Sequence, residues 1–504
     1  MAGKAPQFLA VLIAAQLLAS EKPDGAKKPA PPTLSRRIDL LLSTEAARSA
    51  RWGLHVVSLS EGRVLYQRNA NEHFAPASNA KLFSTALALE RLGPDHRVVT
   101  RVMATRRPDA EGKLDGDLRL VGAGDPSLSG RVFPYRKNGE PGNLMEPVEQ
   151  LAGEIIRAGV RTITGDIAGD DRRYVWEPYP EGWTIDDAMW EYGAPVSALP
   201  FNDNAFTLAL RPGPEPGDGA FLSINPPFVP FVFDNRVRTI QTGTSAIRLE
   251  RVPGSRQVHL SGTITARNGA IRQLLAVDDP ALYAATALYD ALTRRGVAIH
   301  GSPVAVHRPA AADAPPSEGG LELARRVSPP LVEMATMVNK VSQNLHAEIL
   351  LREVALARGR EATREAGLKE LSGFLEEIGI ARSAGHFEDA SGLSRRALIS
   401  PSAITRLLVF MDRRPLRQVW DAMMPIGGED GTLSTRFERA TRARAIHAKT
   451  GTLATASALS GYLTTQHGVR LAFSIIANNH TAPSSEIRRV LDRIGLALLD
   501  WEGK

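Results

Sequence analysis

The clearest hydrophobic pattern in the chain follows residue 78, where apolar side chains recur every three or four positions. They are Leu82, Phe83, Ala86, Leu87 and Leu89. This spacing places them on one face of a helix, and Gly93-Pro94 ends the pattern. The sequence therefore predicts a helix with Ser78 at or near its start and Lys81 three residues on. Two residues at this spacing share one helix face.

A helix and a hairpin are predicted before this segment. The apolar residues between Leu34 and Ala50 suit a helix. Two runs of strand-forming residues, Trp52–Leu59 and Arg63–Gln67, are separated by Ser60-Glu61-Gly62, which favours a turn. We therefore expect an antiparallel pair of strands just before the helix that follows Ser78.

The pattern changes over residues 97–320, where short strand-like runs are separated by glycine and proline. The runs are Arg97–Ala104, Leu118–Val121, Thr162–Ile167, Ala205–Leu210, Ala246–Arg251 and Val258–Thr265. Breakers between runs of this length are typical of β-rich domains. Pro309–Gly320, rich in alanine and proline, predicts a linker. The region is therefore expected to be a β-rich insertion, which we expect to form two domains.

Helical spacing returns after Pro329, and the chain ends in strands and a helix. The apolar positions of the helical part are Met334, Met337, Val338, Val341 and Leu345, with Ser342 and Asn344 among them. Ile446–Thr450, Ala458–Thr465 and Val469–Ala477 predict adjacent antiparallel strands. An amphipathic helix from Ser484 to Leu499 should cover them. Residues 35–96 and 321–504 are thus predicted to form one domain in two segments.

The N-terminus suggests export. Lys4 precedes an apolar run from Phe8 to Ala19, which is too short to span a membrane comfortably because a spanning helix needs ~20 apolar residues. Small residues near Ala19-Ser20 suit a cleavage site, so residues 1–20 are predicted to be a signal peptide. Residues 21–34 are predicted to be a flexible linker. An uncleaved anchor is the alternative.

Composition narrows the chemistry. The chain has 504 residues, of which 43% are hydrophobic and 23% charged, and these are globular values. With no cysteine, it has no thiol nucleophile, thiolate metal site or disulfide. No metal or other cofactor is expected. The net charge is +6, but no long basic run appears, so nucleic acid is not an expected partner.

Three short motifs appear in a fixed order along the predicted elements. They are Ser78-Asn79-Ala80-Lys81, Ser342-Gln343-Asn344 and Lys449-Thr450-Gly451. A serine hydroxyl becomes a good nucleophile only when a base removes its proton. A lysine can be that base if burial or nearby cations lower its pKa. We therefore predict a serine acylation site with Ser78 as nucleophile, Lys81 as base and Lys449 as a nearby cation.

The remaining motif residues have roles that follow from their chemistry. Ser342 can relay a proton to a leaving amine, and Asn344 can hold Lys81 and the substrate amide. Lys449 and Thr450 can bind a substrate carboxylate, while Gly451 admits the substrate backbone close to the strand. The backbone N–H groups of Ser78 and Thr452 are candidates for an oxyanion hole. Alternatively, Ser78 is a plain helix cap and Lys449-Thr450-Gly451 is the end of a strand.

The motifs and their surroundings resemble the class C low-molecular-mass penicillin-binding proteins, which are D-alanyl-D-alanine carboxypeptidases and endopeptidases. The matching segments are Pro76–Lys81, Gly124-Asp125-Pro126, Gly165-Asp166-Ile167, Gly182-Trp183, Tyr192–Pro195, Ser328–Glu348, Asp389–Arg395, Gly431-Thr432-Leu433 and His447–Leu453. Two positions depart from the usual pattern: Gln343 replaces the frequent Asp or Asn, and Ala390 replaces Gly. Neither departure removes a catalytic group.

The resemblance implies a multi-domain α/β fold: a serine β-lactamase/transpeptidase-like domain, with an antiparallel sheet flanked by helices, interrupted by inserted β-rich domains. It implies an acyl-enzyme on Ser78, peptidoglycan stem peptides as substrates and β-lactam antibiotics as covalent inhibitors. Asp187 and Arg395, with Tyr192 nearby, match family positions that bind the side chain of the stem peptide's diamino acid. Asp186 adjoins Asp187, which leaves the first of these assignments open.

Other functions remain open from the sequence. A serine β-lactamase or esterase could use the same scaffold, although an insertion of over two hundred residues is unlike a compact lactamase. The third hypothesis is a non-catalytic protein that binds the cell wall. We expect the protein in the periplasm or cell-wall space, with room for a peripheral association with membrane or wall. The sequence does not distinguish carboxypeptidase from endopeptidase preference.

Overall fold

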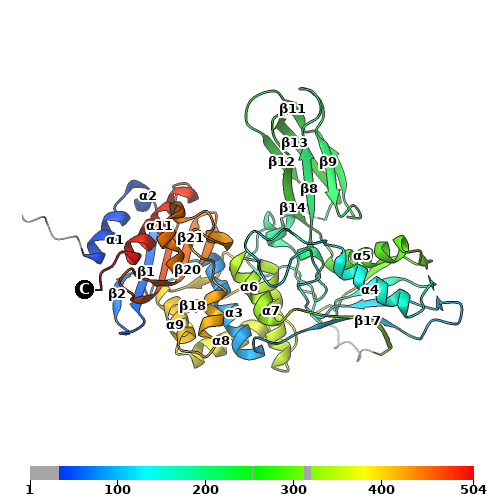
Figure 1. The fold of residues 1–504 in the computed structure, drawn as a ribbon, viewed down its shortest axis with the longest axis horizontal. Coiled ribbons are helices and arrows are strands. Elements are labelled where there is room, and N and C mark those ends of the chain that lie inside the picture. Colours follow the sequence, from blue (N-terminus) through cyan, green and yellow to red (C-terminus); the bar gives the residue numbers. More distant parts are fainter. Residues whose placement is uncertain (1–32, 253, 311–318, 504) are drawn as a thin grey trace, which may run out of the picture.

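The computed structural model describes residues 33–252, 254–310 and 319–503. The predicted signal peptide, and the predicted linker up to residue 32, lie outside the described residues. A helix-flanked sheet stands at one end of the molecule and the inserted region at the other, with a β-tower rising from the inserted region (Figure 1). Among the described residues, no helix combines the length and apolarity needed to cross a membrane.

Both ends of the chain build the main sheet, which is antiparallel throughout. Its strands run in the order β2-β1-β22-β21-β20. Their bounds are β1 Arg51–Ser58, β2 Val64–Arg68, β20 Ile446–Leu453, β21 Ala456–Thr464 and β22 Arg470–Asn478. The predicted hairpin and the three predicted C-terminal strands are thus confirmed to within two or three residues at each end. Strand β20, which carries the third motif, lies at the edge of the sheet.

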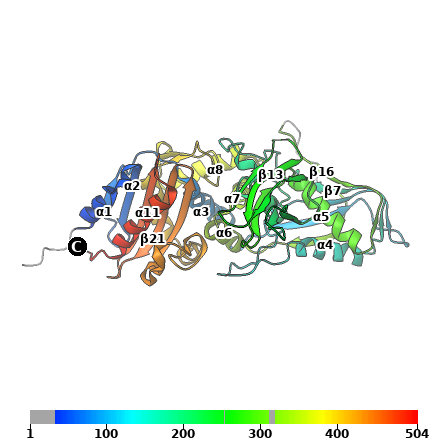
Figure 2. The same cartoon turned by 90° about the horizontal axis from the view of Figure 1, so that it is seen from above.

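Alternate residues of the central strands pack on two different helical layers. Ala458 and Tyr462 face a core shared with helices α3 and α9, whereas Leu459 and Leu463 face a core shared with α1 and α11. The helices are α1 Leu34–Leu42, α2 Glu45–Arg48, α3 Ala80–Leu92, α9 Pro401–Asp412 and α11 Ser484–Leu499. Figure 2 shows α1, α2 and α11 gathered at the outer end of the molecule. The prediction of one continuous helix over residues 34–50 is wrong. Thr44 has an extended backbone and separates α1 from α2.

The helices between the sheet and the inserted region complete the first part. They are α6 Leu331–Lys340, α7 Asn344–Ala357, α8 Arg364–Glu377 and α10 Arg417–Ala422. The expectation that the apolar spacing continues unbroken past Ser342 is wrong. Helix α6 ends at Lys340, α7 begins at Asn344, and Ser342 between them has a φ of +64°. The second motif therefore lies at a break between two helices.

The inserted region contains a five-stranded sheet, ordered β16-β7-β5-β3-β17, and two helices that the strand pattern did not predict. The strands are β3 Val99–Ala104, β5 Leu118–Val121, β7 Ile167–Asp170, β16 Pro303–Val306 and β17 Leu321–Val327, and the helices are α4 Glu146–Arg157 and α5 Pro280–Arg294. A three-stranded sheet beside it contains β4 Lys113–Leu114, β6 Thr162–Ile163 and β15 Ala298–Ile299. The single strand predicted over 162–167 is therefore wrong, since β6 and β7 belong to different sheets.

Two small sheets form the tower. Their strands are β8 Ala205–Arg211, β9 Phe221–Asn225, β10 Val232–Asn235, β11 Arg238–Ile240, β12 Ala246–Glu250, β13 Gln257–Thr265 and β14 Ile271–Ala276. One cluster of buried apolar side chains joins the tower to the five-stranded sheet. It includes Val102 in the sheet and Phe206 and Val258 in the tower. Strand β17 pairs with β3, so residues 321–327 extend the sheet of the inserted region. The domain division itself stays a prediction.

Candidate active site

Ser78 lies in a tight turn that leads into α3. The turn is a short 3-10 helix, Ala77–Asn79, and Ala77 has a φ of +47°, which is uncommon for a residue with a side chain. The edge strand β20 packs directly on this turn: a Cβ added to Gly451 would lie 2.7 Å from the Pro76 carbonyl oxygen. Gly451 therefore admits the chain's own nucleophile turn, in addition to the substrate backbone for which the sequence suggested it.

Lys81 is fully buried, and its ammonium faces three acceptors. Its Nζ donates to Ser78 Oγ at 2.8 Å, to Asn344 Oδ1 at 2.5 Å and to the Ser391 carbonyl at 2.7 Å. A neutral amine has two N–H groups and one lone pair. The amide oxygen of Asn344 and the carbonyl of Ser391 can only accept, so they hold the two N–H groups. The lone pair is then left facing the hydroxyl of Ser78, as a base requires.

Burial lowers the pKa of Lys81 to about 7, although three carboxylates act in the opposite direction. They belong to Asp389, Glu348 and Glu191. A pKa near neutrality gives a general base a large neutral fraction while keeping it basic enough to take a proton. The surroundings of Lys81 thus lower its pKa, as the sequence argument required, and they do so mainly by excluding water.

Sequence reasoning did not identify these three carboxylates as parts of the site. Glu348 lies on α7 and is fully buried, and burial raises its pKa to about 7. Its Oε1 accepts the backbone N–H groups of Ala390 and Ser391, which fixes the loop whose carbonyl holds Lys81. Glu348 ends a segment that resembles the family and is a charged residue inside an apolar helical run, but neither signal gave it a role. Glu191 had no such signal.

Asp389 organises that loop from the other side. Its carboxylate accepts from Trp183 Nε1, Ser391 Oγ and the backbone N–H groups of Gly392 and Ser394. Gly392 has a φ of +75°, and an added Cβ would lie 1.9 Å from the Ala77 carbonyl oxygen. The loop can pass this close to the nucleophile turn only because the residue is glycine.

The second motif enters the site at the break between α6 and α7. Ser342 Oγ accepts a hydrogen bond from Lys449 Nζ at 2.8 Å. Asn344 bridges two parts of the molecule, since its Oδ1 accepts from Lys81 and its Nδ2 donates to the Tyr192 carbonyl at 2.6 Å. Gln343 turns away from Ser78 and donates to Glu191 Oε1 at 2.6 Å. The middle residue of this motif therefore ties the helix break to the inserted region.

The third motif supplies a second buried lysine. Lys449 is fully buried, and burial lowers its pKa well below the usual value, as does the charge of Lys81. Its Nζ donates to Ser342 Oγ and to the Thr450 carbonyl. The hydroxyl of Thr450 donates to Thr432 Oγ1 at 2.8 Å. Within the described part of the chain, no carboxylate pairs with Lys449, so an incoming anion would be its ionic partner and would favour its charged form.

Thr452 is exposed on the same edge strand. The backbone N–H of Ala448 donates to Pro425, away from β21. N–H groups alternate in direction along a strand, so those of Thr450 and Thr452 also point away from β21, at the free edge of the sheet. This direction suits the predicted oxyanion hole, in which the backbone of Ser78 would be the other donor.

The structure brings two of the three residues assigned by resemblance together. Arg395 forms a two-pronged ion pair with Asp187, at 2.6 Å between Nη1 and Oδ2 and 3.3 Å between Nη2 and Oδ1. Asp187 is buried, whereas the neighbouring Asp186 is exposed. The side chain of Tyr192 is 43% exposed, and its backbone carbonyl holds Asn344. This cluster therefore lies on the inserted-region side of the catalytic groups.

The arrangement can carry out acyl transfer with its own side chains. A hydroxyl faces a buried amine with a pKa of about 7, and a second hydroxyl faces a second buried amine. Among the described residues, no group of three or more His, Asp or Glu side chains is placed to hold a metal ion. This geometry suits a serine nucleophile with a lysine as its base.

Known proteins resemble the chain over nearly its whole length. The sequence model of the D-Ala-D-Ala carboxypeptidase 3 (S13) family matches residues 34–497. A D-alanyl-D-alanine carboxypeptidase from Actinomadura sp. (strain R39) is 32% identical over 482 residues, 93% of this chain and 85% of that protein. The carboxypeptidase DacB of Haemophilus influenzae is 23% identical over 450 residues, 88% of this chain and 89% of that protein.

Solved structures agree on the fold. The crystal structure of penicillin-binding protein 4 (dacB) from Haemophilus influenzae superposes with a TM-score of 0.77 at 22% identity, covering 92% of this chain and 98% of that one. A second structure of the same protein, complexed with a β-lactam, has a TM-score of 0.72 at 21% identity and covers 92% of this chain and 99% of that one. The predicted fold class, a sheet-and-helix domain interrupted by a large insertion, is confirmed.

Proposed function

The chain belongs to the D-Ala-D-Ala carboxypeptidase 3 (S13) family and is a serine-type carboxypeptidase of that specificity, and we propose that it works through an acyl-enzyme on Ser78. The observation that carries this proposal is the contact of 2.8 Å between Lys81 Nζ and Ser78 Oγ, made inside a site that lowers the pKa of Lys81 to about 7. Ser342 is also hydrogen-bonded to a buried lysine, Lys449, whose pKa burial lowers as well, but only Ser78 and Lys81 share one face at the start of a helix.

The proposed reaction proceeds in two halves. Lys81 takes the proton of Ser78 as Oγ attacks the carbonyl carbon, and the N–H groups of Ser78 and Thr452 stabilise the developing oxyanion. Ser342, held by Lys449, relays the proton that Lys81 has taken to the leaving nitrogen, so D-alanine departs as a neutral amine, an ester remains on Ser78 and Lys81 is neutral again. Water then cleaves the ester, with Lys81 as base, and restores the hydroxyl.

We propose peptidoglycan stem peptides as substrates and β-lactams as covalent inhibitors. Lys449 and Thr450 would bind the terminal carboxylate, while Asp187 and Arg395 would bind the charged side chain of the diamino acid. The β-lactam complex of the Haemophilus influenzae relative supports the second part for that protein. The apolar run from Phe8 to Ala19 supports export to the periplasm or cell-wall space.

The test is the mass of the intact protein after mixing with benzylpenicillin, measured for wild type and for Ser78→Ala. We expect a persistent adduct of the mass of penicillin on wild type and none on Ser78→Ala. An adduct on both proteins would assign the nucleophile elsewhere. Consumption of penicillin without a lasting adduct would identify a β-lactamase instead.

A further inference from the structure

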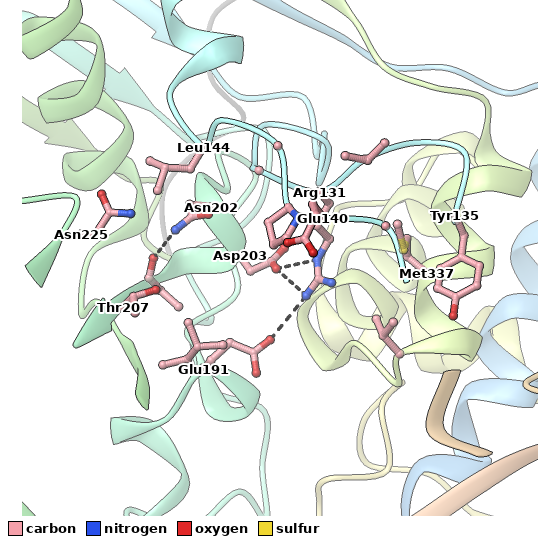
Figure 3. Close-up of a pocket in the computed structure, with 18 of the residues that line it drawn as sticks. Arg131, Tyr135, Glu140, Leu144, Glu191, Asn202, Asp203, Thr207, Asn225 and Met337 are labelled. Carbon is pink, nitrogen blue, oxygen red and sulfur yellow. Dashed lines mark hydrogen bonds and ion pairs between the residues drawn. The ribbon is translucent and has the colours of Figure 1, made fainter. Parts of the chain in front are cut away.

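Two cavities of different character lie against the tower. The first, of about 410 Å³, has a charged wall, and Figure 3 shows its Arg131 directed at Asp203 and Glu191. The second, of about 620 Å³, lies between the loop over residues 176–189 and the segments that follow β12 and β14. Both volumes fall in the range of sites that hold small ligands. Their different walls suit different ligands.

The second cavity is called the aromatic cavity here, because Trp176, Tyr179 and Trp183 line it. Trp176 stacks on His307, with ring centroids 4.0 Å apart and ring planes 25° apart. Trp183 donates from Nε1 to Asp389, so its polar atom already has a partner. Tyr179 is 41% exposed. The cavity therefore offers a ligand flat apolar surface, on which two of the three rings are held in place by their neighbours.

The two charged side chains that line the aromatic cavity pair with each other. Arg251 Nη2 lies 3.0 Å from Asp278 Oδ1, and Arg251 also donates to the carbonyls of Ala276 and Ala188 at 3.3 and 3.2 Å. Among the described residues in its lining, no unpaired charge is left for an ionic ligand. The half-exposed carboxylate of Asp278 and the hydroxyl of Tyr179 can still bond to hydroxyl groups. The lining thus suits a neutral ligand.

A pyranose sugar combines the properties that this lining requires. The C–H groups on one side of its ring form an apolar face that packs on aromatic rings, while its hydroxyl groups bond to polar atoms at the edge. Tyrosine and tryptophan supply such flat surface at a low cost in conformational entropy. An N-acetylated amino sugar is also neutral. A muramic acid becomes neutral when its carboxyl group is joined to a peptide.

The loop that lines the aromatic cavity also contacts the site proposed for the diamino acid. Thr184, a lining residue, donates from its backbone N–H and its hydroxyl to Asp187 Oδ2, both at 2.9 Å. Asp187 pairs in turn with Arg395. In a stem peptide, two residues and a lactyl group separate the diamino acid from the sugar, an extended span of ~10 Å. A sugar on a bound stem peptide can therefore reach the cavity.

We propose that the aromatic cavity binds an N-acetylated amino sugar of the glycan strand that carries the stem peptide. The proposal rests on the proposed function, because a stem peptide held at Ser78 would bring its sugar to the cavity. The sugar takes no part in the reaction and serves only to hold the substrate. A stem peptide that is still attached to its sugar should therefore bind more tightly than the bare peptide.

The test follows the release of D-alanine from two substrates, the disaccharide pentapeptide and the same pentapeptide with an acetyl group in place of the sugar. The variants are Tyr179→Ala, which removes an exposed ring from the cavity, and Tyr179→Phe, which keeps the ring. The matched control is Phe221→Ala, since Phe221 is 61% exposed on the tower and lies outside the cavity. The constants kcat and KM are measured separately, and circular dichroism checks the fold.

We expect the KM of wild type to be about three- to tenfold lower for the substrate with the sugar, if a sugar–ring contact is worth as much as a pair of aromatic rings. Tyr179→Ala should lose this advantage with kcat unchanged within about twofold, and Tyr179→Phe and Phe221→Ala should keep it. Equal KM values of wild type for the two substrates would overturn the inference. Equal losses on both substrates in Tyr179→Ala would also overturn it and assign the cavity to the peptide.

A binding measurement separates this inference from the proposed function. Saturation-transfer NMR on Ser78→Ala, with short peptide-free chains of N-acetylglucosamine, needs no turnover. We expect transfer to the sugar protons that is lost when Tyr179→Ala is added and kept when Phe221→Ala is added. Absence of transfer, or transfer that Tyr179→Ala leaves unchanged, would overturn the inference even for an active enzyme. A wild type that releases no D-alanine from either substrate would refute the proposed function, and the NMR result would still decide whether the cavity binds sugar.

Discussion

The two sides of the catalytic cleft each contain one fully buried lysine, yet the surroundings of these lysines differ. On the helix side, Lys81 has three hydrogen-bond acceptors and three carboxylates that raise its pKa. On the strand side, Lys449 has a hydroxyl and a carbonyl as acceptors, and among the described residues the charge that shifts its pKa is the cation of Lys81. The same residue type is thus placed under opposite electrostatic influences.

The difference teaches how one cleft can use a lysine for two purposes. Carboxylates close to Lys81 prevent burial from lowering its pKa too far, so the amine stays basic enough to take a proton near neutral pH. Among the described residues, no carboxylate raises the pKa of Lys449 in this way. A substrate carboxylate that binds there would do so. Binding of an anion would therefore favour the charged form of Lys449, which in turn strengthens the binding.

Removing the base should have the largest effect. In Lys81→Ala the amine opposite Ser78 Oγ is lost, and we expect the rate of acylation by benzylpenicillin to fall about 10³-fold or more, since positioned proton transfer contributes up to about 10⁴-fold. Timed measurements of intact mass follow the adduct, and circular dichroism checks that the variant is folded. Acylation at a near-normal rate would exclude Lys81 as the base.

Removing the strand-side lysine should have a smaller effect that depends on the substrate. We expect Lys449→Met to lower kcat/KM for a D-Ala-D-Ala peptide by about 10- to 100-fold, the usual worth of a hydrogen bond to a charged group. The matched substrate has its terminal carboxylate converted to an amide, and on it the loss should be several-fold smaller, because only the hold on Ser342 is then removed. The same loss on both substrates would show that Lys449 serves the chemical step.

Changing the carboxylates should move the pH dependence of acylation. Acylation requires neutral Lys81, so its rate falls as the pH drops through the pKa of about 7. Glu191, Glu348 and Asp389 raise this pKa. In Glu191→Gln one of these charges is lost, while an oxygen that can accept from Gln343 is retained. The pKa should therefore fall, and the acid limb of the rate profile should move to lower pH by roughly 0.5–1 unit, one unit being about 1.4 kcal/mol.

The control for this shift is Glu61→Gln, a change in the exposed turn of the β1–β2 hairpin. Its acid limb should coincide with that of wild type. An acid limb that stays in place in Glu191→Gln, or moves to higher pH, would contradict an electrostatic role for Glu191. A lower rate at every pH with no shift would show that Glu191 acts only by holding Gln343.

The two lysines and their motifs were predictable from sequence because each lies on an element with a strong local pattern. The apolar face after Ser78 and the strand through Lys449 both have the periodicity of their secondary structure, and both were found. Ser342 was placed on a helix because Val341 continues the apolar spacing. Ser342 instead has a positive φ, and its hydroxyl meets Lys449 from a distant segment.

The effect of the three carboxylates on Lys81 could not be predicted from sequence, because contacts between distant segments create it. Glu191 lies 110 residues after Lys81 in the sequence and in a different part of the fold, and only the completed chain brings it near the site. Helices α4 and α5 were missed because glycine, proline and short strand-like runs around them dominated the pattern of the inserted region. Local periodicity therefore predicted the elements, but not the long-range contacts that set the pKa of Lys81.

The smallest effect should come from the ion pair at the edge of the cleft. Asp187 is buried, but Arg395 is 40% exposed, so solvent screens part of their attraction. In Asp187→Asn we expect kcat/KM to fall about three- to tenfold for a stem peptide with a charged diamino acid and to change less than about twofold for one with alanine at that position. The exposed neighbour provides the control, since Asp186→Asn should leave both substrates unaffected. If Asp186→Asn gives the larger loss, the side-chain site belongs to Asp186. Equal losses on both peptides would mean that the ion pair only supports the fold, and the inserted-region side of the cleft would then contribute structure without specificity.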